Sequence, residues 1–233
     1  MVNKWINFIQ FQLFPPTCML CGAPGLPGLD ICFECQSELS YNRSCCSRCA
    51  VPLPSPSVEI CGACLKSPPK FDSCFSPFVY EGYVADLVSR LKFHSQLQSA
   101  RLLAHLMMQE IEEQEVDLPD LMLPVPLHPS RIRERGYNQA VELGRYLSKG
   151  LKIKMDRFSC VRKRSTEAQT SLPRKKRINN VRGAFALPKE ISADHVALLD
   201  DVVTTGSTAG ELAALLKQSG VKRVDVWTIA RTS

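Results

Sequence analysis

The sequence lacks a long hydrophobic run. Its apolar stretches are short and interrupted by charge, as in residues 195–200, whereas a membrane-spanning helix needs about 20 apolar residues. Residues 1–14 mix Asn and Gln with apolar side chains and lack a small-residue cleavage site, so they make a poor signal peptide. We therefore expect no membrane span, an amphipathic helix at residues 1–14, and a cytoplasmic protein.

The sequence also lacks the compositional bias of disordered or collagen-like chains. Its 233 residues are 45% hydrophobic and 22% charged. This length is sufficient for one full domain with a substantial core and a smaller module. Ten of the 11 Cys fall at or before Cys74, and ten of the 16 Pro at or before Pro77. This shift predicts an N-terminal module over residues 1–70 and a second domain over residues 71–233.

The cysteines of the front part form four C-x-x-C doublets. Two such loops supply the four thiolates that a tetrahedral Zn²⁺ site requires. A disulfide framework is the alternative, but the lack of an export signal favours reduced thiols. With four sulfur ligands, each site is closed and structural rather than catalytic. The predicted ligands are Cys18, Cys21, Cys32, Cys35, Cys46, Cys49, Cys61 and Cys64.

The pairing of the doublets stays open at this point. Sequential pairing is the simplest of three arrangements, and Cys45 offers an alternative to Cys46 at C-x-x-x-C spacing. Cys74 and Cys160 have no partner at ligand spacing, so we expect ordinary buried thiols.

The second domain alternates strand and helix patterns. Apolar residues recur at helical spacing in 84–91 and 102–111, and alternating or compact apolar runs predict strands. This order predicts an α/β fold with a parallel sheet flanked by helices. Strands are expected at residues 75–80, 121–125, 196–199 and 223–230, and further helices at 139–151 and 207–219.

Residues 196–208 carry the most informative pattern. A buried strand ends on Asp200 and Asp201, and a loop of hydroxyl residues around Gly206 then opens a helix, with a possible capping box from Thr208 to Glu211. Free N–H groups and hydroxyls at a helix start can cradle a phosphate. The acids would accept hydrogen bonds from sugar hydroxyls or hold Mg²⁺.

This segment resembles the phosphoribosyl-pyrophosphate (PRPP) signature of the type I phosphoribosyltransferases. The resemblance implies that the acids bind ribose hydroxyls at the catalytic centre and that the loop binds the 5′-phosphate, with Mg²⁺ accompanying PRPP. The implied PRPP-binding residues are Asp200, Asp201, Val202, Thr204, Thr205, Gly206, Ser207 and Thr208.

Together with the cysteine doublets, the chain resembles the ComF/GntX-like family of competence-associated proteins over nearly its whole length. Further likeness lies in residues 91–93, 125–128, 135–140, 169–172 and 177–185. The resemblance implies a type I phosphoribosyltransferase-like sheet behind a small zinc-ribbon module. It also implies a bacterial protein that acts in natural transformation on incoming single-stranded DNA. No hood that would read a particular base is recognisable.

The positive charge is concentrated in one stretch. Residues 131–182 hold 16 Lys and Arg against 4 Asp and Glu, although the net charge of the chain is only +6. A solvated loop is the ordinary explanation, but pyrophosphate needs cations, and nucleic acid needs a basic track with aromatics such as Tyr137, Phe158 and Phe185. We assign Arg131 and Arg135 to PRPP, and Arg162, Lys163, Arg164, Arg174, Lys175, Lys176, Arg177 and Arg182 to nucleic acid.

Three functions therefore compete. The first is a DNA-processing protein that binds PRPP or a related phosphorylated sugar. The second is an active phosphoribosyltransferase on a nitrogenous base or nucleotide. The third is a scaffold for competence or recombination proteins with a vestigial site. The basic track is longer than pyrophosphate alone requires, and this excess favours the DNA-processing function over the other two.

Overall fold

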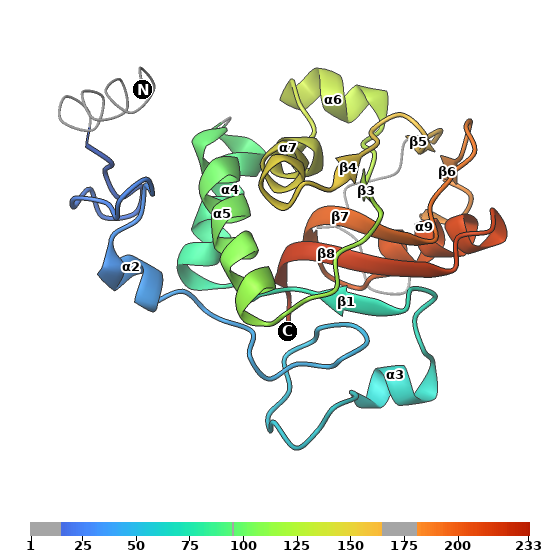
Figure 1. Ribbon diagram of the computed structural model, residues 1–233, viewed down its shortest axis with the longest axis horizontal. Helices are drawn as coiled ribbons and strands as arrows, with labels where there is room; N and C mark the ends of the chain where they lie inside the picture. The colour runs from blue at the N-terminus through green and yellow to red at the C-terminus, as the bar shows by residue number, and fades with distance from the viewer. Residues whose placement is uncertain (1–14, 95, 165–180) are drawn as a thin grey trace.

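A computed structural model describes residues 15–94, 96–164 and 181–233, and shows a parallel sheet between helices (Figure 1). The main sheet has the strand order β1-β8-β7-β3-β4, and β2 also pairs with β8; all of these pairings are parallel. The predicted α/β class is confirmed. The amphipathic helix expected at residues 1–14 lies outside the described residues.

Most strands of the sheet lie close to the predicted positions, but the strand at residues 154–155 was not predicted, and the one expected at residues 196–199 continues to Val203. The strands are β1 (Ser73–Phe75), β2 (Phe78–Val79), β3 (Leu121–Pro124), β4 (Lys154–Met155), β7 (His195–Val203) and β8 (Arg223–Arg231). The single strand expected at residues 75–80 is instead two strands, β1 and β2, which both pair with β8. Pro77 lies between them and has no N–H to continue the ladder. A separate antiparallel pair joins β5 (Val161–Arg162) and β6 (Phe185–Ala186).

Five helices are described in the second part of the chain, and all but one of them bury an apolar face. They are α4 (Gly82–Phe93), α5 (Gln98–Glu113), α6 (Pro129–Arg135), α7 (Gln139–Leu151) and α9 (Ser207–Gln218). In α4 the predicted face of Val84, Leu87, Val88 and Leu91 is buried. Helix α6 was not predicted, and it buries none of its residues.

The two faces of the sheet belong to different cores. Ala197 and Leu199 of β7 pack with α4, α5 and α7, whereas Val196 and Leu198 of the same strand pack with α9. This division follows from the two-residue period of a strand. The sheet is therefore covered on both sides, as a parallel sheet requires.

Each cysteine-rich ribbon ends in a short helix, α2 (Phe33–Ser37) or α3 (Gly62–Lys66). Cys32 and Cys61 are the N-caps, and their sulfurs accept hydrogen bonds from the amides of Cys35 and Cys64. The first ribbon shares the core of α4 and α5, whereas residues of the second join the core of α9. The same sequence pattern thus packs against opposite sides of the sheet.

Candidate functional site

The four doublets form two clusters whose geometry fits zinc. The Sγ atoms within each cluster all lie within 4.8 Å of one another. The Sγ atoms of Cys21 and Cys32 are 3.6 Å apart, and those of Cys49 and Cys61 are 3.7 Å apart. A tetrahedron with Zn–S bonds of about 2.3 Å has edges of roughly 3.8 Å. The clusters are therefore consistent with structural zinc.

The pairing of the doublets is sequential. Cys18, Cys21, Cys32 and Cys35 form one cluster, and Cys46, Cys49, Cys61 and Cys64 form the other, so Cys46 rather than Cys45 is the ligand. Burial opposes ionisation of Cys18 and Cys46, but backbone hydrogen bonds outweigh it and lower their pKa values to about 6 and about 7. These bonds favour the thiolate that a metal needs.

The two cysteines without a partner at ligand spacing are buried thiols, as predicted. Cys74 and Cys160 are buried, and burial raises the pKa of each. A raised pKa keeps a thiol protonated and inert at neutral pH.

The acid pair lies near the carboxyl end of β7. Asp201 is 3% exposed, and its Oδ1 accepts a hydrogen bond from the Val202 amide, while Asp200 is half-buried. Burial and the charge of Asp201 raise the pKa of Asp200 to about 8. The ionised form of Asp200 therefore has too little positive charge around it. A cation, or a hydrogen-bond donor of a ligand, would stabilise that form.

Cations from two other parts of the chain approach this pair. Lys92 Nζ lies 3.1 Å from Asp201 Oδ2 and 5.9 Å from the centre of the Tyr80 ring. Burial lowers the pKa of the Arg162 guanidinium; the charge of Asp200 raises it and that of Arg131 lowers it. Screening limits such charge effects to about 10 Å. Lys92 therefore contacts the acid pair and Arg162 lies within range of the Asp200 charge, although Arg162 was assigned to nucleic acid. Arg131 instead forms an ion pair with Glu134 at 3.1 Å.

The hydroxyl loop follows β7 directly and opens α9. Gly206 has φ +71° and is the N-cap of α9, and the hydroxyls of Thr205 and Ser207 are 2.7 Å apart. The predicted capping box from Thr208 to Glu211 is wrong. The helix begins at Ser207, and Glu211 instead accepts a hydrogen bond from the Gly183 amide.

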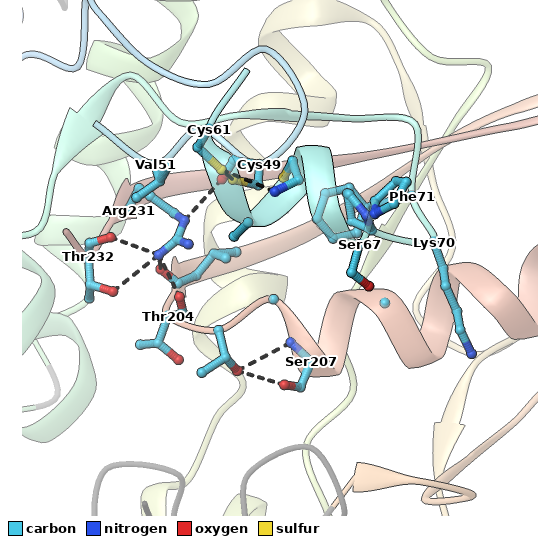
Figure 2. A pocket seen from close by; sticks show the side chains of 18 of the residues that line it. Cys49, Val51, Cys61, Ser67, Lys70, Phe71, Thr204, Ser207, Arg231 and Thr232 are labelled. Carbon is cyan, nitrogen blue, oxygen red and sulfur yellow. Dashed lines mark hydrogen bonds between the residues drawn. The ribbon is translucent and has the colours of Figure 1, made fainter. Parts of the chain in front are cut away.

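A cavity of about 820 Å³ lies on the ribbon side of this loop (Figure 2). Residues 204–207 form part of its wall, and Cys49, Cys61 and Cys64 of the second cluster line it as well. Phe71 also lines the cavity and would be 3.5 Å from a Cβ added at Gly206. The loop and a zinc ribbon thus share one cavity.

Arg231 joins the ribbon to the loop across this cavity, and sequence analysis did not identify it. The side chain is 8% exposed, and its Nε donates a hydrogen bond to the Cys49 carbonyl. Its Nη1 donates to the carbonyls of Val203, Thr204 and Thr232 (Figure 2). The signal in the sequence is an Arg that directly follows the apolar residues Ile229 and Ala230 at the end of β8.

The basic residues predicted to bind PRPP or nucleic acid differ in their contacts. Arg135 Nη1 donates to the Gln139 Oε1 atom at 2.6 Å, and Arg164 Nη2 donates to the Arg182 carbonyl at 2.7 Å. Lys163 is exposed and pairs through its backbone with Ala184. Four predicted nucleic-acid residues lie outside the described part of the chain: Arg174, Lys175, Lys176 and Arg177.

The aromatic candidates differ in their access to solvent. Phe185 is 7% exposed, and the Tyr137 hydroxyl donates a hydrogen bond to the Leu91 carbonyl. Phe158 is 60% exposed, with the Arg157 guanidinium 4.8 Å from its ring centre. Phe93 was not considered for stacking, although it is 66% exposed and Arg135 lies 5.7 Å from its ring centre.

Comparison with known proteins shows similarity over nearly the whole chain. The DNA utilization protein YhgH of Salmonella typhimurium is 35% identical over 223 residues, which cover 94% of this chain and 98% of that protein. Competence protein F of Haemophilus influenzae is 33% identical over 234 residues, which cover 97% and 99%. Competence protein ComFC of Streptococcus pneumoniae is 26% identical over 234 residues, which cover 92% and 99%.

Two further matches concern parts of the chain. Residues 10–65 match the family model described as a double zinc ribbon domain. A purine phosphoribosyltransferase from Pyrococcus horikoshii covers 56% of this chain, with 80% of its own chain matched, 16% identity and a TM-score of 0.32. Within the described residues, no helix has the length and apolar character to cross a bilayer.

Proposed function

This chain belongs to the family of competence protein F and the DNA utilization protein YhgH, and we propose that it acts on incoming single-stranded DNA during natural transformation. In this proposal the protein also binds PRPP or a related phosphorylated sugar. In this second function, Asp200, Asp201 and the loop of residues 204–208 bind the sugar-phosphate ligand.

The observation that carries the sugar-phosphate part is the charge arrangement at the end of β7. Asp200 and Asp201 offer carboxylate oxygens, which accept hydrogen bonds from vicinal sugar hydroxyls. Lys92 and Arg162 lie close enough to act on their charges. The hydroxyls and helix start at residues 205–208 suit a phosphate.

Magnesium fits the same arrangement. Mg²⁺ in such sites is held by one or two carboxylates together with the phosphates of the substrate. The raised pKa of Asp200 reflects a carboxylate without enough positive charge beside it, and Mg²⁺ bound with the ligand would stabilise its ionised form. Asp200 and Asp201 are the residues that would hold the ion.

Calorimetry tests the sugar-phosphate part. We expect Mg-PRPP to bind the zinc-loaded wild type and to bind Asp200→Asn/Asp201→Asn at least tenfold more weakly, because the mutant loses the acceptors for the sugar hydroxyls. Asp194→Asn is the control, since Asp194 lies just before the other end of β7 and pairs with the exposed Lys222. Equal PRPP affinity in the double mutant and the wild type would refute the assignment.

A salt titration tests the DNA part. If five phosphates are neutralised, the affinity for single strands falls with log[salt] at a slope of about −3.5. The same oligonucleotide should still bind the double mutant, because the acids do not contact DNA phosphates. Binding that does not depend on salt, or no binding, would contradict the DNA part and leave the sugar-phosphate part standing.

An active phosphoribosyltransferase is the second candidate, and the cations beside the acid pair favour it. In that reaction the nitrogen of a base attacks C1 of PRPP while pyrophosphate leaves. Arg162 and Arg131 would stabilise the departing charge. Release of pyrophosphate from PRPP with any member of a panel of bases would support this candidate, and its absence would favour binding alone.

A further inference from the structure

Phe93 is a large apolar side chain in solvent that directly follows Lys92, the residue that contacts Asp201. It ends α4 and is 66% exposed. The preceding residue, Lys92, turns inward to Asp201 and is only 20% exposed. Because successive residues of a helix point about 100° apart, one turn of α4 offers a cation to the acids and a ring to solvent.

Contacts from the α6–α7 connection hold this ring beside a guanidinium. Arg135 lies 5.7 Å from the ring centre, and the buried Gln139 accepts a hydrogen bond from Arg135 Nη1. The Tyr137 hydroxyl also donates to the Leu91 carbonyl, two residues before Phe93. The ends of α4 and α6 are therefore tied together, so the ring and its cation are already in place before any ligand binds.

An unpaired base can bind to a flat, exposed aromatic ring that has a cation beside it. A base stacks on an aromatic side chain whatever its sequence, and Arg adds attraction to the phosphates. Phe158 has a similar exposure, but its cation is its neighbour Arg157, so that pair involves no contact between separate elements. The Phe93–Arg135 pair joins two elements, and one of them, α4, carries the Lys92 that contacts Asp201.

We propose that Phe93 and Arg135 form a stacking site for one base of single-stranded nucleic acid next to Asp200 and Asp201. This proposal rests on the DNA part of the proposed function. It adds that binding there depends on the base and not only on phosphate charge. The site carries no sequence preference, because the ring makes no hydrogen bond to base edges.

The experiment compares a labelled oligothymidylate with an abasic strand of equal length and charge, by fluorescence anisotropy. The variants are Phe93→Ala, Phe93→Trp and Phe33→Ala. Phe33 is the matched control, since it is 69% exposed but lies on the first ribbon. Far-ultraviolet circular dichroism checks that each variant is folded.

We expect Phe93→Ala to weaken binding of oligothymidylate by about 5- to 100-fold and to leave the abasic strand and the salt slope unchanged. Phe93→Trp should retain binding, and strand binding should quench its indole fluorescence more than that of the wild-type tryptophans. Phe33→Ala should match the wild type.

Four outcomes overturn the proposal. If Phe93→Ala binds oligothymidylate as the wild type does, or if the wild type binds both strands equally, the stacking site is refuted while DNA binding stands. Equal weakening by Phe33→Ala would show a general effect of exposed rings and also refute it. If the wild type binds neither strand, the DNA part of the proposed function fails and the stacking site with it.

Discussion

Replacing Arg231 by Met should loosen both the hydroxyl loop of residues 204–207 and the second zinc ribbon. The Nε atom of Arg231 has one proton and Nη1 has two, so these nitrogens donate at most three full hydrogen bonds among their acceptors. Those acceptors include the carbonyls of Cys49, Val203 and Thr204. Met fills a similar volume but donates nothing, which leaves these carbonyls without this donor.

The expected loss in the free energy of unfolding follows from those three bonds. A hydrogen bond to a charged group contributes about 1.5–3 kcal/mol. Such bonds are not additive, so we expect Arg231→Met to cost about 3–5 kcal/mol in the free energy of unfolding. Urea denaturation of the zinc-loaded protein measures this cost.

Zinc release separates this explanation from a general loss of stability. Because Arg231 holds the Cys49 carbonyl, we expect one of the two zinc equivalents to pass to a colorimetric chelator faster in Arg231→Met, while the other keeps its wild-type rate. Arg223→Met is the control: Arg223 begins the same strand and pairs with Asp117 and Asp225, away from the ribbon. Wild-type urea stability, or equal zinc release from both variants, would refute the reasoning.

Three further predictions concern the site and the clusters. Cys46→Ser should reduce bound zinc from two equivalents to one by atomic absorption, because Cys46 belongs to only one cluster; unchanged stoichiometry would contradict the ligand set. Asp200→Asn should stabilise the protein at pH 8 by a few kcal/mol, because the raised folded pKa of Asp200 makes its contribution to stability fall between about pH 4 and 8; a gain as large at pH 4 would count against this. Gly206→Ala should cost about 1 kcal/mol in urea denaturation, since Gly206 has φ +71° and the Phe71 ring leaves only ordinary contact room; wild-type stability would show that the loop relaxes.

Periodic segments of the chain were predictable because packing preserves their pattern. Helix α7 spans Gln139–Leu151, which are the predicted bounds, and its apolar stripe faces the core. Helix α6 was missed because its seven residues bury no side chain and so leave no apolar period to detect. The sequence signal that remains is Pro129 at its first position after the N-cap His128, an arrangement typical of helix starts.

The site could be predicted only where its residues are adjacent in sequence. Residues 200–208 form a continuous motif, so their association needs no knowledge of the fold. The ion pair of Lys92 with Asp201, the effect of the Asp200 charge on the pKa of Arg162, and the hydrogen bonds from Arg231 to the loop all depend on how distant segments meet. Glu211 shows the same limit. In a capping box its carboxylate would accept a hydrogen bond from the backbone at the start of its own helix, but it accepts one from the Gly183 amide instead.

The two ribbons show how one repeated pattern acquires two roles through packing. Cys18, Cys32 and Cys35 share the core of α4 and α5, so zinc bound to the first cluster would stabilise the helical layer that carries Lys92 and Phe93. In the second cluster, Cys49 and Cys61 line the cavity beside the hydroxyl loop, and Arg231 donates hydrogen bonds to the carbonyls of both Cys49 and Thr204. Loss of the first zinc should therefore act on the whole fold, whereas loss of the second should act first on the loop. The difference lies in what each ribbon touches, because the cysteine spacing is nearly the same in both.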